Sequence, residues 1–138
     1  MSLSDKFWSD ARLSDCTLCP RLCHANRLEG QAGYCGRAAG LVIARAALHM
    51  WEEECISGVN GSGTVFFAGC NMGCIFCQNY KISRAGRAAV KPDCQRTADR
   101  RIGTEVTAGR LAEIFLELEG QGANNINLVT PTHYVPQI

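Results

Sequence analysis

The sequence predicts an α/β fold in which a strand–helix–strand unit follows a small cysteine-rich module. Residues 64–68 (TVFFA) are mostly β-branched or aromatic, as in a buried strand. Residues 107–123 carry apolar side chains at helical spacing, and residues 124–130 (NNINLVT) contain a second apolar run. Because strand, helix and strand follow in this order, we expect a parallel pair joined by a crossover. Upstream, proline and glycine break residues 1–38 into loops.

The helix has the clearest boundaries. Its apolar positions follow the i, i+3, i+4, i+7 pattern at Leu111, Ile114, Phe115 and Leu118. Thr107 suits the N-cap, and Gly120 or Gly122 suits the C-terminal end. The strand that follows is expected to be buried on both faces. We therefore expect two strands and one long helix.

Two other segments have weaker patterns. Residues 41–50 (LVIARAALHM) are apolar, but their spacing fits a strand as well as a helix. Residues 83–103 are polar, basic and without periodicity, so they predict an exposed connection.

Composition limits the classes of partner. The chain of 138 residues has 14 Lys and Arg against 13 Asp and Glu, so its net charge does not favour nucleic acid or an anionic membrane. No run approaches the roughly 18 apolar residues of a membrane span, and the first residues lack a signal-peptide pattern. We expect a soluble, cytoplasmic protein.

Nine cysteines are the one extreme feature of the composition. In a reducing cytosol, clustered cysteines are more often metal ligands or redox groups than disulfides. Two single cysteines accompany two groups, which we name the N-terminal cysteine group and the loop cysteines. The N-terminal cysteine group is Cys16, Cys19, Cys23 and Cys35; the loop cysteines are Cys70, Cys74 and Cys77; the single ones are Cys55 and Cys94.

The N-terminal cysteine group lies in residues 1–38, which we treat as a metal-binding module. Four thiolates suit a tetrahedral structural zinc, and they suit a second iron–sulfur cluster equally well. Either metal centre could fold a module too small for a core of its own. Residues 39–62 are expected to connect this module to residues 63–138.

The loop cysteines supply three ligands within eight residues, in the spacing C-x3-C-x2-C. Iron–sulfur cubanes normally take four thiolates, so a cluster held by three keeps one open iron that can bind a small molecule. Gly69 and Gly73 permit unusual backbone angles around such a group. Two alternatives remain open. One is zinc with His49, His133 or a distant cysteine, and the other is a ferredoxin-like cluster completed by Cys55 or Cys94.

Three longer strings resemble a known family. GSGTVFFAGCNMGCIFCQN, with Phe76 just before the last loop cysteine, resembles the radical S-adenosylmethionine (SAM) enzymes, and most closely the subgroup related to pyruvate formate-lyase activating enzymes. CTLCPRLC…GYCG and INLVTPTHY resemble the same subgroup. The resemblance covers residues 16–80 and 104–138.

The resemblance implies a site and a chemistry. The loop cysteines would ligate a [4Fe–4S] cluster whose open iron binds SAM, and reductive cleavage of SAM would give a 5′-deoxyadenosyl radical. Phe76 and Asn79 would lie near the cofactor. Many members have a Gly-Gly-Glu stretch where this chain has INLVTPTHY, so Thr130 and Thr132 are the nearest substitutes for a contact to the SAM amino group.

The family fold is a full or partial (β/α) barrel, and residues 63–138 would be its N-terminal, incomplete portion. A ferredoxin or flavodoxin would donate electrons, and a glycyl-radical enzyme is a candidate protein substrate. Two other hypotheses are an iron–sulfur or zinc module that carries electrons without a catalytic pocket, and a truncated fragment without activity. The substrate would be set by residues beyond Ile138.

Overall fold

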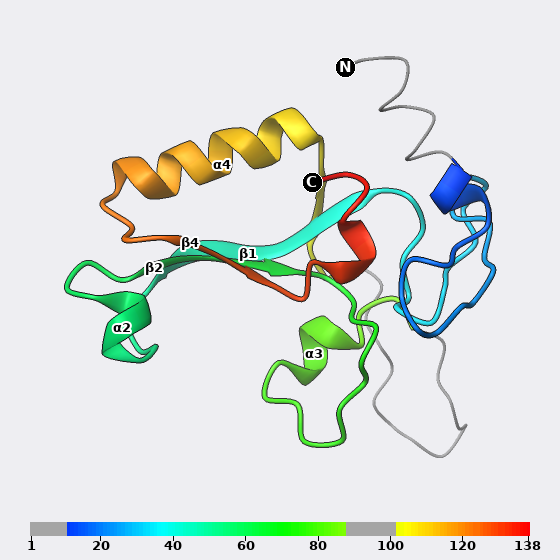
Figure 1. The fold of residues 1–138 in the computed structure, drawn as a ribbon, viewed down its shortest axis with the longest axis horizontal. Coiled ribbons are helices and arrows are strands. Elements are labelled where there is room, and N and C mark those ends of the chain that lie inside the picture. Colours follow the sequence, from blue (N-terminus) through cyan, green and yellow to red (C-terminus); the bar gives the residue numbers. More distant parts are fainter. Residues whose placement is uncertain (1–10, 88–101) are drawn as a thin grey trace.

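A four-stranded mixed sheet, covered on one face by a single long helix, forms the centre of the computed structural model (Figure 1). The structure describes residues 11–87 and 102–138. The elements are β1 (Leu41–His49), α2 (Glu54–Ser57), β2 (Ser62–Phe67), α3 (Tyr80–Ser83), β3 (Thr104–Val106), α4 (Ala108–Gly120), β4 (Ile126–Val129) and a 3₁₀ turn (Thr132–Tyr134). None of the described helices is long and apolar enough to cross a membrane.

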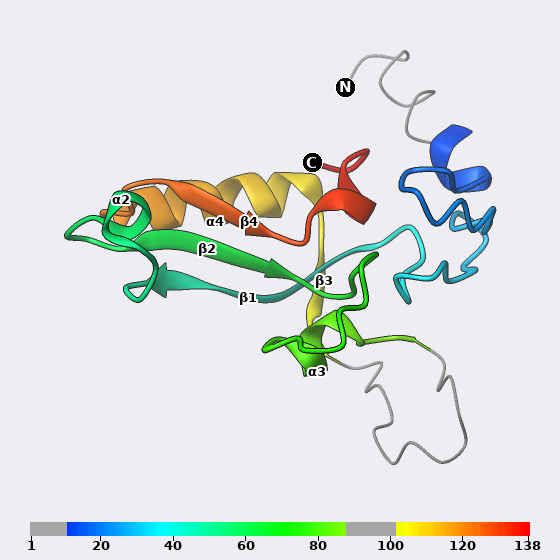
Figure 2. The ribbon, with the colours of Figure 1, turned by 60° about the horizontal axis from the view of Figure 1, so that its bottom comes forward.

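The strand order is β3-β1-β2-β4. β2 and β4 are parallel, with Phe66 opposite Val129, which confirms the predicted parallel pair (Figure 2). β1 runs antiparallel to both β2 and β3. The fold is therefore α/β, as predicted, but its sheet is mixed.

The expectation of only two strands is wrong, because β1 and β3 belong to the same sheet. β1 occupies the segment whose pattern fitted both a strand and a helix. Its pairing with β2 shifts register between Ile43 and Arg45, and such an irregularity breaks the alternation of a regular strand. β3 has only three residues, none of them buried, so its sequence carries almost no pattern.

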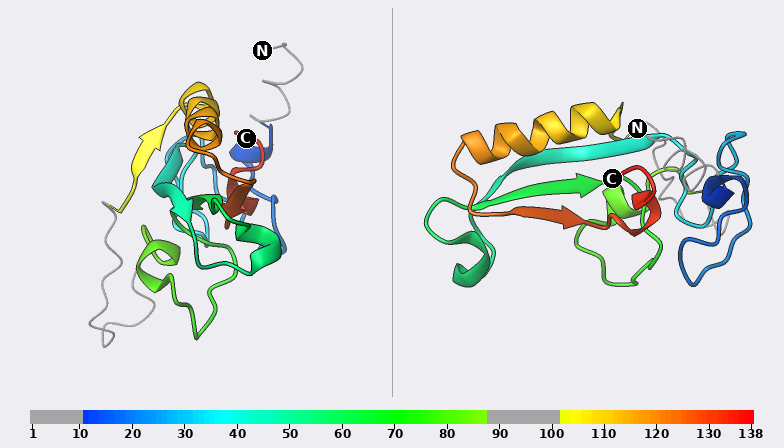
Figure 3. Two further views of the ribbon diagram at one scale, coloured as in Figure 1. Left: turned by 90° about the vertical axis from the view of Figure 1, so that its left-hand side faces the viewer. Right: turned by 45° about the horizontal axis from the view of Figure 1, so that its top comes forward.

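The core lies between the sheet and α4 (Figure 3). Leu111 and Leu118 of α4 are buried against a group from the sheet and the C-terminal turn, namely Leu41, Ile43, Val65, Phe67 and Tyr134. Thr107 caps the helix, since its hydroxyl accepts a hydrogen bond from the Arg110 amide at 3.1 Å. Gly122, with φ of +90°, follows the end of the helix. The predicted helix is thus confirmed.

β4 differs from its prediction. All four of its residues are half-buried, whereas burial on both faces was expected. The reason is its place at one edge of the described sheet. β2, which lies between β1 and β4, is almost entirely buried and matches its prediction.

Two leucines of α4 provide a test of this packing. Leu111 is 2% exposed and Leu116 is 67% exposed. We expect Leu111→Ala to lower the free energy of unfolding by about 2–5 kcal/mol, because it leaves a cavity under the sheet. Leu116→Ala, the matched control, should change it by less than about 0.5 kcal/mol. Urea unfolding measures both, and equal losses in the two variants would contradict this packing.

Candidate metal centre

The loop cysteines lie between β2 and α3, where the chain leaves the carboxyl end of β2 (Figure 1). We name residues 68–79 the cysteine loop. Because β4 runs parallel to β2, the residues that follow β4 reach the same edge of the sheet. In open α/β sheets, ligands bind outside the carboxyl ends of the strands.

The three thiols differ in exposure. Cys70 is buried, Cys77 is intermediate and Cys74 is exposed. The Cys70 sulfur accepts a hydrogen bond from the Met72 amide at 3.4 Å, and the Cys77 thiol donates to Ser83 Oγ at 3.4 Å. Within the described residues, no three Cys, His, Asp or Glu side chains are arranged to hold a metal ion. The three thiols therefore lie on one short segment, but they do not converge on a common point.

Residues after β4 hold the start of the cysteine loop. The Thr130 hydroxyl lies 3.4 Å from the carbonyl oxygens of both Phe67 and Gly69. His133 Nε2 and the Tyr134 hydroxyl both donate to the Ala68 carbonyl, at 3.0 and 3.1 Å. The three carbonyl groups that lead into the loop cysteines are thus fixed by side chains from the far end of the chain.

His133 and Tyr134 are themselves buried. Burial lowers the pKa of His133 to about 4, with a smaller opposing contribution from its hydrogen bond to Ala68. Burial also raises the pKa of Tyr134 to about 12. His133 Nδ1 has no hydrogen-bond partner within the described residues. Both rings therefore stay neutral at physiological pH and act as fixed donors to the loop backbone.

Three arginines hold the next part of the loop, and we name them the arginine set. They are Arg21, Arg84 and Arg87. Their guanidinium groups donate to the carbonyl of every residue from 70 to 73. The bonds run from Arg87 to Cys70, from Arg21 to Asn71 (2.9 Å) and Met72 (2.7 Å), and from Arg84 to Gly73 (2.9 Å).

Arg27, Arg37 and Arg87 are buried beside this loop, with exposures of 0%, 8% and 9%. Among the residues described, none of the three pairs with a carboxylate. Several of their N–H groups, such as Arg37 Nε and Arg87 Nη1, have no hydrogen-bond partner there either. A buried cation is costly unless an anion lies near it. Metal-bound thiolates are such anions, so these residues fit a metal–thiolate group between them.

In the N-terminal cysteine group, Cys16, Cys23 and Cys35 interact with one another. Burial raises the pKa of Cys35, and the charges of Cys16 and Cys23 add to that rise. For Cys23, desolvation is outweighed by hydrogen bonds, the strongest from the Tyr34 backbone, so its pKa falls below the ordinary value. Cys19 is half-buried on the same loop. Within the described residues, however, no three of these thiols are arranged to hold a metal ion either, so the metal-binding module stays a prediction.

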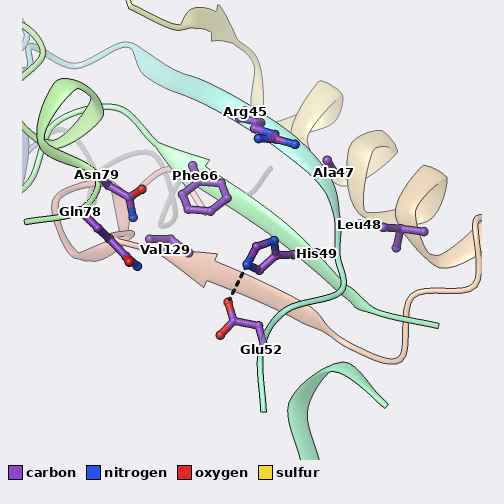
Figure 4. Close-up of a pocket in the computed structure, with 9 residues that line it drawn as sticks. All are labelled: Arg45, Ala47, Leu48, His49, Glu52, Phe66, Gln78, Asn79 and Val129. Atoms are coloured by element: carbon purple, nitrogen blue, oxygen red, sulfur yellow. Dashed lines mark ion pairs between the residues drawn. The ribbon is translucent and has the colours of Figure 1, made fainter. Parts of the chain in front are cut away.

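A cavity of about 530 Å³ adjoins the cysteine loop (Figure 4). It is lined by Arg45, Ala47, Leu48, His49, Glu52, Phe66, Gln78, Asn79 and Val129. Phe66 alternates with the buried Val65 and Phe67 along β2, so the cavity lies on the sheet face opposite α4. Gln78 and Asn79 directly follow the last loop cysteine. The size is typical of small-molecule sites.

The other predicted site residues lie as follows. Phe76 is 98% exposed, and Thr132 is exposed in the 3₁₀ turn. Asn79 lines the cavity. The Thr130 hydroxyl donates its hydrogen to the backbone carbonyls at the start of the cysteine loop, but its oxygen can still accept a hydrogen bond. Of the alternative ligands, Cys55 is exposed on α2 and Cys94 lies outside the described residues.

The arginine set was missed from the sequence. Residues 83–103 were expected to form an exposed connection, and this is wrong for its first described part, where Ser83, Ala85 and Arg87 are buried. The signal that could have found it is the basic residues that flank both cysteine groups.

Comparison with known proteins gives one similarity. The chain is 39% identical over 70 residues to an uncharacterized protein of Methanocaldococcus jannaschii, and this match covers 51% of the chain. The chain spans about a fifth (19%) of that relative's length. No protein-family model matches the chain, and no solved structure matches it.

His133 provides a pH test of the contacts behind the cysteine loop. The unfolded chain binds a proton at His133 below the ordinary pKa of 6.5, whereas the folded chain resists until about pH 4. The free energy of unfolding should therefore fall as pH drops from 6.5 to 4, by about 3 kcal/mol from this residue. We expect His133→Gln to flatten that decline in chemical-unfolding curves taken across this range. His24→Gln, at an exposed histidine beside Asp15, should retain it. If the free energy of unfolding still declines over this pH range in His133→Gln, the decline arises from other titratable groups.

Proposed function

We propose that this chain is the N-terminal part of a cytoplasmic radical SAM iron–sulfur protein. The loop cysteines would ligate a [4Fe–4S] cluster and leave one iron open for SAM. The observation that carries the proposal is the cysteine loop itself, whose C-x3-C-x2-C spacing occurs where the chain leaves a parallel strand. The buried arginines beside it, which pair with no carboxylate among residues 11–87 and 102–138, support an anionic occupant.

The loop cysteines would hold a cluster that, when reduced, would supply one electron for cleavage of SAM to methionine and a 5′-deoxyadenosyl radical, and this radical would abstract hydrogen from a substrate. The role of the chain's own residues would be to bind and orient SAM. The Thr130 oxygen can accept a hydrogen bond from the SAM ammonium group, and Thr132 lies two residues further on. Asn79, at the rim of the cavity, offers both a donor and an acceptor. Phe76 would cover the cofactor from the solvent side.

The cavity supports a place for SAM and substrate. In a (β/α) barrel the helices cover the outside and the opposite face of the sheet lines the interior. Here α4 covers one face and the cavity lies on the other. We infer that β2, α4 and β4 begin such a barrel, and that β1 and β3 extend its first edge.

The N-terminal cysteine group would hold a second metal centre, either zinc or a further iron–sulfur cluster. Reduction would come from a ferredoxin or flavodoxin. A glycyl-radical enzyme remains the candidate protein substrate, through residues outside this chain.

An electron-carrying module without SAM chemistry is the second candidate, and one observation favours it. Cys74, Ile75 and Phe76 are all exposed at the tip of the cysteine loop, the last two at 87% and 98%. An exposed apolar tip beside a cluster suits contact with a redox partner. Binding of SAM distinguishes the two functions, because only the radical SAM function requires SAM to reach an iron atom of the cluster.

Electron paramagnetic resonance tests the proposal. The chain is reconstituted anaerobically with iron and sulfide, reduced, and measured with and without SAM. We expect a cluster signal that shifts on addition of SAM. Cys74→Ser should abolish that signal, because two thiolates cannot hold the cluster. Cys55→Ser, also at an exposed cysteine, is the matched control and should retain it. A signal indifferent to SAM would favour the electron carrier.

A further inference from the structure

We propose that the N-terminal cysteine group is a structural metal centre whose loading positions the cysteine loop, and that Arg21 and Tyr34 transmit the effect. This inference rests on metal binding by both cysteine groups in the proposed function. It assigns the two residues a positioning role, since neither supplies a metal ligand.

Arg21 stands between two members of the N-terminal cysteine group, Cys19 and Cys23. Its side chain reaches the other group, donating from Nε to the Asn71 carbonyl and from Nη2 to the Met72 carbonyl. A planar guanidinium makes such a paired contact in one orientation only, so it fixes the direction of two peptide groups at once. These two peptide groups lie between the first two loop cysteines.

Tyr34 directly precedes Cys35 and links two members of the arginine set, Arg21 and Arg87. The Arg21 guanidinium lies 3.9 Å from the centre of its ring, and the Arg87 guanidinium lies 4.0 Å from it. Each arginine therefore gains a cation–π contact while its N–H groups hold the loop. The Tyr34 hydroxyl also faces Gly73, where a Cβ would lie 2.7 Å from it.

The two backbones also touch directly. A Cβ on Gly69 would lie 2.5 Å from the carbonyl oxygen of Cys35, and one on Gly36 would lie 2.6 Å from the Arg87 amide nitrogen. Only glycine fits at such distances. The first contact joins residues 33–37 to the start of the cysteine loop, and the second joins them to the segment that carries Arg87, so a shift of residues 33–37 disturbs both.

Metal binding supplies the free energy for the coupling. Residues 16–35 contain no strand and few buried apolar side chains, and backbone hydrogen bonds and the buried Arg27 hold them together, so a metal would add to an order that these contacts begin. A metal held by the N-terminal cysteine group would close both ends of this segment and set both residues. By linkage, an ordered cysteine loop would raise the affinity of the N-terminal centre by the same factor.

The test uses zinc as the probe and the exchange of backbone amide hydrogens as the readout. In the full chain, all three loop cysteines are replaced by serine, so that zinc reports on the N-terminal cysteine group. We expect one zinc per chain and about tenfold slower exchange in residues 69–75, a size typical of coupled sites. The single variant Cys74→Ser repeats the measurement with the two less exposed loop thiols intact, in case the triple variant fails to fold.

Variants in the same background separate positioning from stability. Arg21→Ala should keep the zinc stoichiometry but lose the slower exchange, and Arg21→Lys should restore only part of it, because an ammonium group cannot make the paired contact. Arg110→Ala is the matched control, since Arg110 pairs with Glu113 and Glu117 on the exposed face of α4. It should leave the slowing unchanged.

Three results would overturn the inference: zinc that binds without slowing exchange in the loop, slowing that persists in Arg21→Ala, or no binding of zinc by the N-terminal thiols. The proposed function fails separately. A zinc-dependent loop in a chain whose cluster ignores SAM would keep the positioning role and remove the radical chemistry.

Discussion

The structure depends on how the cysteine loop's backbone is held. Every carbonyl from residue 67 to residue 73 lies within hydrogen-bond distance of a side-chain donor, first from residues 130–134, where Phe67 and Gly69 share the Thr130 hydroxyl, and then from the arginine set. A loop without regular structure has no backbone partners for its carbonyl groups, as a strand or helix would have. Leaving these carbonyls without a hydrogen bond is costly where the loop is buried. Its shape is therefore fixed by side chains from distant parts of the chain.

The same contacts explain the concentration of positive charge. Donors that satisfy several carbonyls at once are best supplied by arginine, which has five N–H groups and no acceptor. Arg87 of the arginine set is buried together with Arg27 and Arg37, which donate to carbonyls outside the cysteine loop, beside a histidine that burial keeps neutral. Without an anion the arrangement is electrostatically costly. In the proposed function, metal-bound thiolates of the two cysteine groups would offset that cost.

The sequence predicted what local patterns control, namely α4 with its Thr107 cap, the parallel pair β2 and β4, and the start of the cysteine loop at the end of a strand. β1 was not assigned as a strand because its register shift breaks the alternation, and β3 was missed because three residues, two exposed and one half-buried, form no pattern. Basic residues flank both cysteine groups, but the carbonyls that the arginine set binds could not be predicted, because a guanidinium's partner depends on which carbonyls tertiary folding brings near. The spacing within each cysteine group is local information that the sequence shows directly. The contact from Arg21 to Asn71, in contrast, joins residues 50 positions apart.

The two segments that hold the cysteine loop also contact each other. Arg27, within the N-terminal module, donates to the His133 carbonyl at 2.7 Å, and Gln137 donates to the Ala39 carbonyl at 2.8 Å. The two segments that hold the loop are thus bound to each other behind it. Any change in the N-terminal module therefore reaches the loop by two routes, through Arg21 and Tyr34 and through His133. In the proposed arrangement, a metal bound by that module would act on the backbone from Phe67 to Gly73 through both routes.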